Sequence, residues 1–308
     1  MTAKKPTNLA ASVRQRLYDR AKAVGEDFQY ALMRYGLERF LYRMSRSQYA
    51  SSFVLKGAVL FQLWSGRPHR ATKDVDLLAS GAPNADRMAR IIREIAVQQV
   101  EPDGLDFQAD DVQAEQIKED DVYQGVRVRL EALLGNARIP LQIDVGFGDA
   151  ITPGPVDISY PTLLDFPAPQ LKSYPRETVV AEKFHAMVQL GMANSRMKDF
   201  YDVWTLANQY EFDGLTLQDA IRATFARRET AIPTEVPIAL KPEFAADRGK
   251  HAQWAAFVRQ SKLTEKELDL GVVTDLLSTF LTPLATAAAE ERSFKQSWIP
   301  PGPWRSTE

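Results

Sequence analysis

The chain has no cysteine, only three histidines and a formal net charge of −2 over 308 residues. Without cysteine, disulfides and thiolate-bound metal sites are excluded, and nothing favours an oxidising compartment. The spacing of His69, His185 and His251 fits neither a metal-ligand pattern nor a catalytic triad. The small net charge gives no support for non-specific binding to nucleic acid.

The sequence also lacks an uninterrupted apolar run of membrane-spanning length. Its first stretch, MTAKKPTNLAASVRQRLYDR, lacks the apolar segment of a signal peptide. We therefore expect a cytoplasmic protein with no membrane partner. With 45% hydrophobic residues, the chain can bury the core of one large domain or two modest ones.

Charge is unevenly distributed along the chain. Residues 1–50 contain ten lysines and arginines against four acids, whereas residues 101–121 contain nine acids against Lys118 alone. The basic segment could meet RNA phosphates, or it could form the solvated faces of amphipathic helices. The sequence leaves both interpretations open.

Residues 53–78 combine a glycine turn with two alternating acids. An apolar run ends at Lys56 and Gly57, where the glycine lets backbone N–H groups approach a ligand and the lysine supplies positive charge. Asp74 and Asp76 are separated by one residue, so in a strand both carboxylates point to the same face. Two such acids repel each other unless a cation lies between them, and Mg²⁺ is a hard ion that prefers oxygen ligands. The segment predicts a phosphate-binding turn beside a Mg²⁺ site, which Mn²⁺ could also fill.

Asp144 is the candidate third carboxylate. It is a lone charge in the apolar strand pattern from Ile139 to Phe147. Burying it unpaired would be costly, so it needs either a metal ion or a hydrogen-bond partner.

Four segments, taken in order, resemble the AbiEii/AbiGii abortive-infection toxin family, which includes the MenT-type toxins and belongs to the polymerase-beta-like nucleotidyltransferase superfamily. They are Leu55 to Gly57, Arg70 to Leu78, Leu141 to Asp149, and Ala181 to Asp202. The resemblance implies a metal-dependent enzyme that transfers NMP from NTP to an RNA acceptor, the 3′ end of tRNA. It also implies a cognate antitoxin encoded by an adjacent gene, and a setting of phage defence.

The same resemblance gives roles to individual residues. It implies catalytic roles for Asp74, Asp76, Asp144, Lys183 and Asp199, of which the first three would hold the metal and Asp144 would also help to deprotonate the attacking hydroxyl. The nucleotide-binding residues would be Lys56, Gly57, Arg70, Thr72 and Arg196. Many relatives have Ser or Gly after the turn glycine, whereas Ala58 here removes a hydroxyl contact.

Several of these residues have a simpler structural interpretation. Thr72 could bind phosphate or hold the entry to the strand. Lys183 could be an ordinary solvated helix lysine. Asp199 and Asp202, three apart on one side of a helix, could reach back to Lys183 or Arg196, or Asp202 could be a structural residue that pairs with Lys198 at a spacing of four.

Periodicity predicts a fold of class α+β (α/β), with a mixed sheet and two N-terminal helices. The second of these, residues 26–43, would leave Arg34, Arg39 and Arg43 nearer its polar side. Six prolines between Pro153 and Pro175 rule out a long regular element there and mark a boundary. We therefore expect two lobes: residues 1–165, with a helical cap, for which the resemblance implies the nucleotidyltransferase fold, and a helical lobe at 166–308. The proline-rich tail of the second lobe, IPPGPW, is expected to lie along the surface.

Two other functions fit the same motifs. One is nucleotidyl transfer to a protein or a small molecule, and the other is a non-catalytic nucleotide-binding module. The acceptor that becomes labelled, and the metal dependence of nucleotide binding, would separate them.

Overall fold

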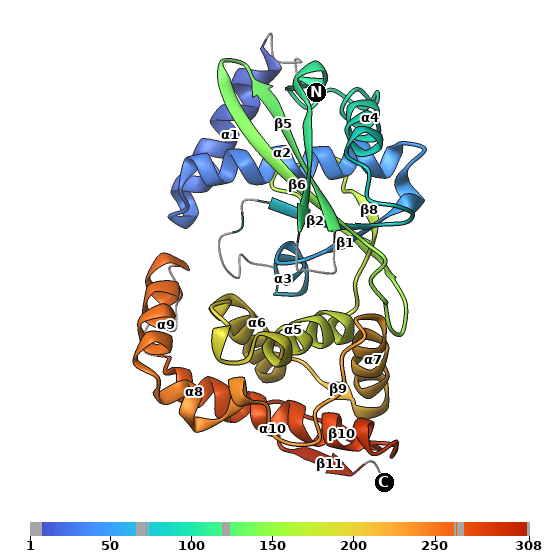
Figure 1. The fold of residues 1–308 in the computed structure, drawn as a ribbon. Helices are drawn as coiled ribbons and strands as arrows, with labels where there is room; N and C mark the ends of the chain where they lie inside the picture. Colours follow the sequence, from blue (N-terminus) through green and yellow to red (C-terminus); the bar gives the residue numbers. More distant parts are fainter. Residues whose placement is uncertain are drawn as a thin grey trace. The chain divides into compact units, whose positions relative to one another are not determined.

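The computed structural model describes residues 8–65, 72, 74–118, 124–261, 263 and 268–306 (Figure 1). Its internal contacts define two units. Unit 1 consists of residues 1–148 and 156–173, and unit 2 of residues 149–155 and 174–308. The chain therefore passes between the units at and near the proline-rich stretch in which the boundary was predicted.

Unit 1 is built on a mixed sheet with the strand order β3-β5-β6-β2-β1-β8-β7, in which β4 pairs with β5. The strands are β1 Phe53–Lys56, β2 Asp74–Ala79, β3 Leu105–Phe107, β4 Gln113–Lys118, β5 Gln124–Leu134, β6 Ala137–Phe147, β7 Val156–Ser159 and β8 Gln170–Ser173. The pairs β2/β6 and β1/β8 are parallel, and the other pairs are antiparallel. The predicted mixed α/β class is confirmed.

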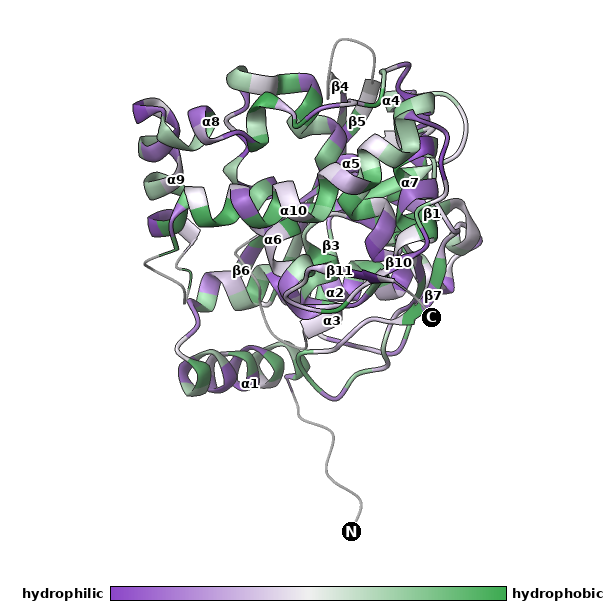
Figure 2. Ribbon diagram, turned by 90° about the horizontal axis from the view of Figure 1, so that it is seen from below, coloured by the Kyte–Doolittle hydropathy of each residue, from purple (hydrophilic) through white to green (hydrophobic). Residues whose placement is uncertain are grey.

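The helices of unit 1 are α1 Leu9–Val24, α2 Phe28–Arg46, α3 Val59–Ser65 and α4 Ala85–Ala96, with short 3₁₀ turns at Ala50–Ser52 and Ala109–Asp111. Helix α1 begins after Asn8, whose side chain accepts a hydrogen bond from the Ala11 N–H at 2.9 Å, and it ends at Gly25 with φ +68°. Helix α2 packs on β6 and on α4 (Figure 1). Green and purple residues alternate along α1 and α9, as expected of amphipathic helices (Figure 2).

The face of β6 that α2 covers is apolar. Gly36 of α2 comes so close to this strand that a Cβ there would lie 3.0 Å from Leu141 Cδ2 and 3.1 Å from Ile139 Cγ2. Side chains alternate along a strand, so Gln142 and Asp144 project from the opposite face. Packing against α2 therefore decides which face of the sheet carries the acidic residues.

Two arginines of α2 are buried, and the prediction that they lie near its polar side is wrong. Arg39 and Arg43 both pair with the buried carboxylate of Asp103, at 3.0 Å from Arg39 Nε and at 2.6 and 3.1 Å from the two Arg43 Nη atoms. Arg34 pairs with Glu26 at 2.6 Å. Much of the positive charge of α2 is therefore neutralised inside unit 1 and is not a surface for RNA.

Glu38, also on α2, is buried beside these pairs. Its Oε2 accepts a hydrogen bond from the Leu163 N–H at 2.7 Å, whereas Oε1 has no hydrogen-bond partner and lies 3.7 Å from Arg39 Nη1. Burial raises the pKa of Glu38 to about 7, against the lowering effects of the Leu163 N–H and the Arg39 charge. The side chain therefore keeps its proton in the folded protein well above the pH at which an exposed glutamate loses it.

The stability of unit 1 should depend on pH through Glu38. In the unfolded chain this carboxyl titrates near 4.5, and in the folded chain at about 7. Its contribution is fully present below pH 4.5 and is lost as pH rises through 7, up to about 3 kcal/mol. Glu38→Gln stays neutral and can still accept from Leu163. Urea unfolding at pH 5, 6, 7 and 8 should therefore show the variant gaining stability relative to wild type as pH rises, and parallel curves would contradict the assignment.

Unit 2 is mainly helical. It contains α5 Arg176–Leu190, α6 Met197–Gln209, α7 Gly214–Arg227, α8 Pro242–Ala246, α9 Arg248–Ser261 and α10 Leu270–Ala289, 3₁₀ turns at Gly191–Ala193 and Ile238–Leu240, and a small sheet of β9 Phe212–Asp213, β10 Gln296–Trp298 and β11 Trp304–Ser306. By length and composition, α10 is the one helix in the described ranges that could cross a membrane, and half of that apolar window is buried within the protein. It packs against α6, α7 and α8, so its apolar character is that of a core helix.

The C-terminal tail IPPGPW lies along the surface, as predicted, and it is attached to unit 2. Residues 299–303 connect β10 and β11, and the Trp304 ring stacks on Phe280 of α10 with centroids 5.6 Å apart. Trp298 is fully buried and donates its indole N–H to the Ala207 carbonyl at 2.6 Å. The prolines exclude a helix, but the two tryptophans bury enough apolar area to attach the tail to unit 2.

Candidate active site

Four charged side chains form a row across the sheet of unit 1. Lys56 on β1 pairs in register with Asp76 on β2, Asp76 with Asp144 on β6, and Asp144 with Arg127 on β5 (Figure 1). In-register neighbours project from the same face of a sheet. We call Lys56, Asp76, Asp144 and Arg127 the charged row; its two acids lie in the middle and a cation lies at each end.

The row brings together three of the residues predicted from the sequence and adds one that was not. In the sequence, Arg127 belongs to the alternating pattern Val126 to Leu130, which indicates a half-exposed strand and no binding role for this arginine. Its role depends on the pairing of β5 with β6, which the pattern does not reveal. Asp74, next but one to Asp76, pairs in register with Gln142 and so lies on the same face.

The turn after β1 passes directly beside Asp76. Gly57 has φ +77°, and a Cβ added there would lie only 1.8 Å from Asp76 Oδ2. A side chain at this position would therefore require both a strained backbone and a displaced carboxylate. The close approach that the glycine allows here is to the Asp76 carboxylate, and α3 begins two residues later at Val59.

Because the resemblance implies that Asp76 is catalytic, Gly57→Ala is expected to reduce nucleotide transfer about a hundredfold, since an acid misplaced by about 1 Å can cost that much. Gly25→Ala is the matched control, since Gly25 also has a positive φ, +68°, but a Cβ there meets nothing within 4 Å. Initial rates of nucleotide transfer for both variants, beside their melting temperatures, would separate backbone strain from displacement of Asp76. Equal rates in the two variants would show that the Asp76 position does not matter.

Thr72 contacts the acidic pair. Its Oγ1 donates to Asp74 Oδ1 at 2.5 Å, so in this structure the hydroxyl orients a carboxylate at the entry to β2. Its predicted nucleotide-binding role stays a prediction. Arg70, also predicted to bind nucleotide, lies outside the described residues.

Asp144 has the hydrogen-bond partner that its burial requires. Arg127 binds it through two parallel contacts, Nε to Oδ1 at 2.8 Å and Nη2 to Oδ2 at 2.7 Å, and Gln142 Nε2 lies 3.2 Å from Oδ2. This is the two-pronged geometry that makes arginine–carboxylate pairs strong. Both oxygens of Asp144 are therefore engaged by protein groups.

The donor set suits a divalent cation only in part. Asp74 and Asp76 present carboxylates on one face, which fits Mg²⁺, an ion commonly bound by one or two carboxylates together with substrate phosphates. Asp144 is less available to a metal ion, because both its oxygens already accept hydrogen bonds from Arg127. Consistent with this, no group of three His, Cys, Asp or Glu residues suited to a metal ion occurs within the part of the chain that the structure describes.

The other predicted residues form a second cluster, in unit 2. Lys183 Nζ on α5 lies 2.6 Å from Asp199 Oδ1 and 2.8 Å from Asp202 Oδ2 on α6, and Arg196 Nε lies 2.6 Å from Asp199 Oδ2. We call these four residues the lysine–aspartate cluster. Both aspartates are fully buried. Burial would raise the pKa of Asp199, but the charges of Lys183 and Arg196 outweigh it and lower the pKa below its usual value.

This cluster decides between two expected arrangements and leaves three predictions open. Asp199 and Asp202 both reach back to Lys183, as expected, whereas the alternative pair of Asp202 with Lys198 does not form. Lys183 is engaged with two buried acids and is not a simply solvated lysine. The catalytic roles of Lys183 and Asp199, and the nucleotide-binding role of Arg196, stay predictions.

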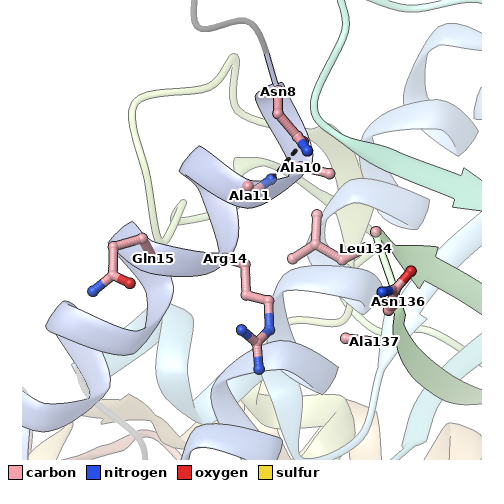
Figure 3. Close-up of a pocket in the computed structure, with 9 residues that line it drawn as sticks. Asn8, Ala10, Ala11, Arg14, Gln15, Leu134, Asn136 and Ala137 are labelled. Atoms are coloured by element: carbon pink, nitrogen blue, oxygen red, sulfur yellow. Dashed lines mark hydrogen bonds between the residues drawn. The ribbon is translucent and has the colours of Figure 1, made fainter.

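A cavity of about 570 Å³ lies elsewhere in unit 1, between the start of α1 and the turn that joins β5 to β6 (Figure 3). Its lining includes Asn8, Arg14, Gln15 and Asn136. None of the predicted site residues lines it, so we do not assign it to the active site.

Comparison with known proteins identifies the class of protein that this fold, with its acidic pair beside a glycine turn, belongs to. The family described as nucleotidyl transferase AbiEii toxin, type IV TA (toxin–antitoxin) system, matches residues 39–280. The chain therefore belongs to the AbiEii nucleotidyltransferase toxin family, which confirms the resemblance found in its sequence motifs. It is an enzyme class whose members act on nucleotides and are paired with antitoxins.

Two crystal structures also match. One, of a candidate nucleotidyltransferase from H. pylori, shares 16% identity with this chain at a TM-score of 0.42 and covers 82% of this chain and 92% of that one. The other, JHP933 from Helicobacter pylori, shares 16% identity at a TM-score of 0.41 and covers 82% and 89%. No curated relative matches.

Proposed function

We propose that this protein is a toxin that transfers a nucleoside monophosphate from an NTP to the 3′ end of tRNA, with Mg²⁺ as the metal ion. The observation that carries the proposal is the acidic pair, Asp74 and Asp76, held beside the Gly57 turn in a chain of the AbiEii family. The toxin acts in the cytoplasm, is neutralised by an antitoxin encoded by an adjacent gene, and serves in defence against phage.

The proposed reaction requires little covalent chemistry from the protein itself. The oxygen of the acceptor hydroxyl forms a bond to the α-phosphorus, the bond from that phosphorus to the bridging oxygen breaks, pyrophosphate leaves, and the hydroxyl proton passes to water. Bound Mg²⁺ supplies positive charge to the α-phosphate and to the leaving group. In this proposal Asp74 and Asp76 hold the ion, Thr72 orients Asp74, and the Gly57 turn fixes Asp76. Lys56 adds positive charge at one end of the charged row for the triphosphate.

To test this, the purified protein is incubated with each α-labelled NTP in turn and with total tRNA as the acceptor. A parallel series uses a protein extract free of RNA as the acceptor. We expect label in tRNA when Mg²⁺ is present, and none with EDTA. Label in protein would favour the alternative acceptor, and label in neither would contradict the proposal.

The position on tRNA can be tested separately. Periodate destroys the terminal 2′,3′-diol and leaves internal hydroxyls and bases intact. Oxidised tRNA should therefore accept no label if the 3′ end is the acceptor. Equal labelling of oxidised and intact tRNA would place the transfer elsewhere on the molecule.

A further inference from the structure

The Arg127–Asp144 pair is the part of the charged row that the proposed function does not use. The contacts of Asp144 are met within the protein, because Arg127 takes both of its oxygens and Gln142 adds a third hydrogen bond. The Asp144 side chain is only 9% exposed, whereas that of Arg127 is 31% exposed. Within the pair, the carboxylate is thus the enclosed partner and the guanidinium the accessible one.

Arg127 has donors left after binding Asp144. A guanidinium carries five N–H groups, and this pair uses one on Nε and one on Nη2. Over the residues that the structure describes, Nη1 makes no hydrogen bond. Its hydrogen atoms are therefore able to bind a further anion without breaking the contact to Asp144.

The position of Arg127 suits an anionic ligand of the acidic pair. It lies in register next to Asp144 and two strands from Asp76. The hydrogen bonds to Asp144 raise the pKa of Arg127 most, and the negative charge of Asp74 raises it further. Lys56 stands at the opposite end of the row. Any triphosphate brought to Asp74 and Asp76 by a divalent cation would have a cation on either side of it.

We propose that Asp144 is a positioning residue and not a metal ligand in this chain, and that it holds Arg127 as a further triphosphate-binding residue. The inference rests on the proposed function for the presence of an NTP at the charged row. It requires no rearrangement of the pair, whereas a metal ion at Asp144 would have to share a carboxylate that already accepts three hydrogen bonds and whose charge Arg127 offsets. The metal is held by Asp74 and Asp76 alone.

Two binding measurements without turnover test this. The first is Mn²⁺ binding to the full chain, followed by electron paramagnetic resonance. Asp144→Asn should keep the Mn²⁺ Kd within about threefold of wild type, because the ion does not use this side chain, while Asp76→Asn should weaken it by about tenfold or more. If Asp144→Asn weakens Mn²⁺ binding as much as Asp76→Asn does, Asp144 is a metal ligand and the inference is wrong.

The second is calorimetric binding, in saturating Mg²⁺, of an NTP analogue in which a methylene group replaces the oxygen between the α- and β-phosphorus atoms, so that no transfer can occur. Arg127→Gln should weaken it by about tenfold, as expected for loss of a charge-assisted hydrogen bond. Adding Asp144→Asn to Arg127→Gln should cause no further loss, because Asp144 acts only through Arg127. A further loss in the double variant, or unchanged binding in Arg127→Gln, would overturn the assignment.

Arg129→Gln is the matched control. Arg129 lies two residues along on the same face of β5 and pairs with Glu115 at 2.8 Å, but its side chain is half exposed and it stands outside the row. This variant should bind NTP as wild type does. If the binding results are as expected but tRNA is not labelled, the proposed transfer to tRNA is wrong and the assignment of Arg127 and Asp144 stands. The two claims can therefore be tested separately.

Discussion

Replacing Asp103 with alanine should reduce the free energy of unfolding of unit 1 by about 3–5 kcal/mol, because it leaves buried charge without a partner. The Asp103 carboxylate binds Arg39 and Arg43, and it also accepts the Leu105 N–H at 3.1 Å. With alanine, both arginines would stay buried without a carboxylate at hydrogen-bonding distance. Glu38 Oε1 lies 3.7 Å from Arg39 Nη1, too far for a hydrogen bond. Urea unfolding followed by circular dichroism measures the loss.

The control for this experiment is Asp106→Ala. Asp106 lies three residues further along in β3, is exposed, and among the described residues its carboxylate accepts a hydrogen bond from Gln108 alone. It should change stability by less than about 0.5 kcal/mol, as most exposed substitutions do. If Asp103→Ala were as mild as this control, the buried arginines would have to find other partners or reach water, and our account of how α2 is held would be wrong.

Lys183→Met should have an effect of similar size on unit 2. The lysine ammonium lies between the buried carboxylates of Asp199 and Asp202, and without it their repulsion is no longer offset at that point. We expect a loss of about 3–5 kcal/mol in unfolding free energy. Lys198→Met, on the exposed side of α6, should be nearly neutral.

A second substitution separates the structural part of this effect from the predicted catalytic one. In Lys183→Met/Asp202→Asn one buried charge is removed, so part of the lost stability should return, while Asp199 keeps Arg196. If this double variant is folded but transfers no nucleotide, the predicted catalytic role of Lys183 gains support. Wild-type transfer rates in the folded double variant would restrict the lysine–aspartate cluster to a structural role.

The sequence predicts local structure well where one element decides it. Strand β2 carries the alternating acids Asp74 and Asp76, as expected, and the cap of α1 at Asn8 follows from side-chain chemistry within one turn. The alternation of Asp74 and Asp76 also needs no other strand, because it follows from the geometry of an extended chain.

Predictions that depend on a distant partner were less successful. Arg39 and Asp103 are 64 positions apart in the chain, so an arginine on α2 looks solvent-facing until its partner is known. Asp144 was correctly expected to need a partner, but the partner, Arg127, becomes visible only once β5 and β6 are paired. The short strands β7 and β8 carry too few residues for a periodic signal, and they lie in the proline-rich stretch.

The most direct test of the central claim is the rate at which labelled NMP appears on tRNA with wild-type protein and with Asp76→Asn. The substitution keeps the size of the side chain but removes the charge that would hold Mg²⁺, which is worth several kcal/mol in the transition state. We predict a loss of about a thousandfold or more in the initial rate. Asp157→Asn, an exposed acid on β7 paired with Lys172, should label tRNA as wild type does. Equal rates for Asp76→Asn and wild type would contradict the claim that the acidic pair beside the Gly57 turn performs the transfer.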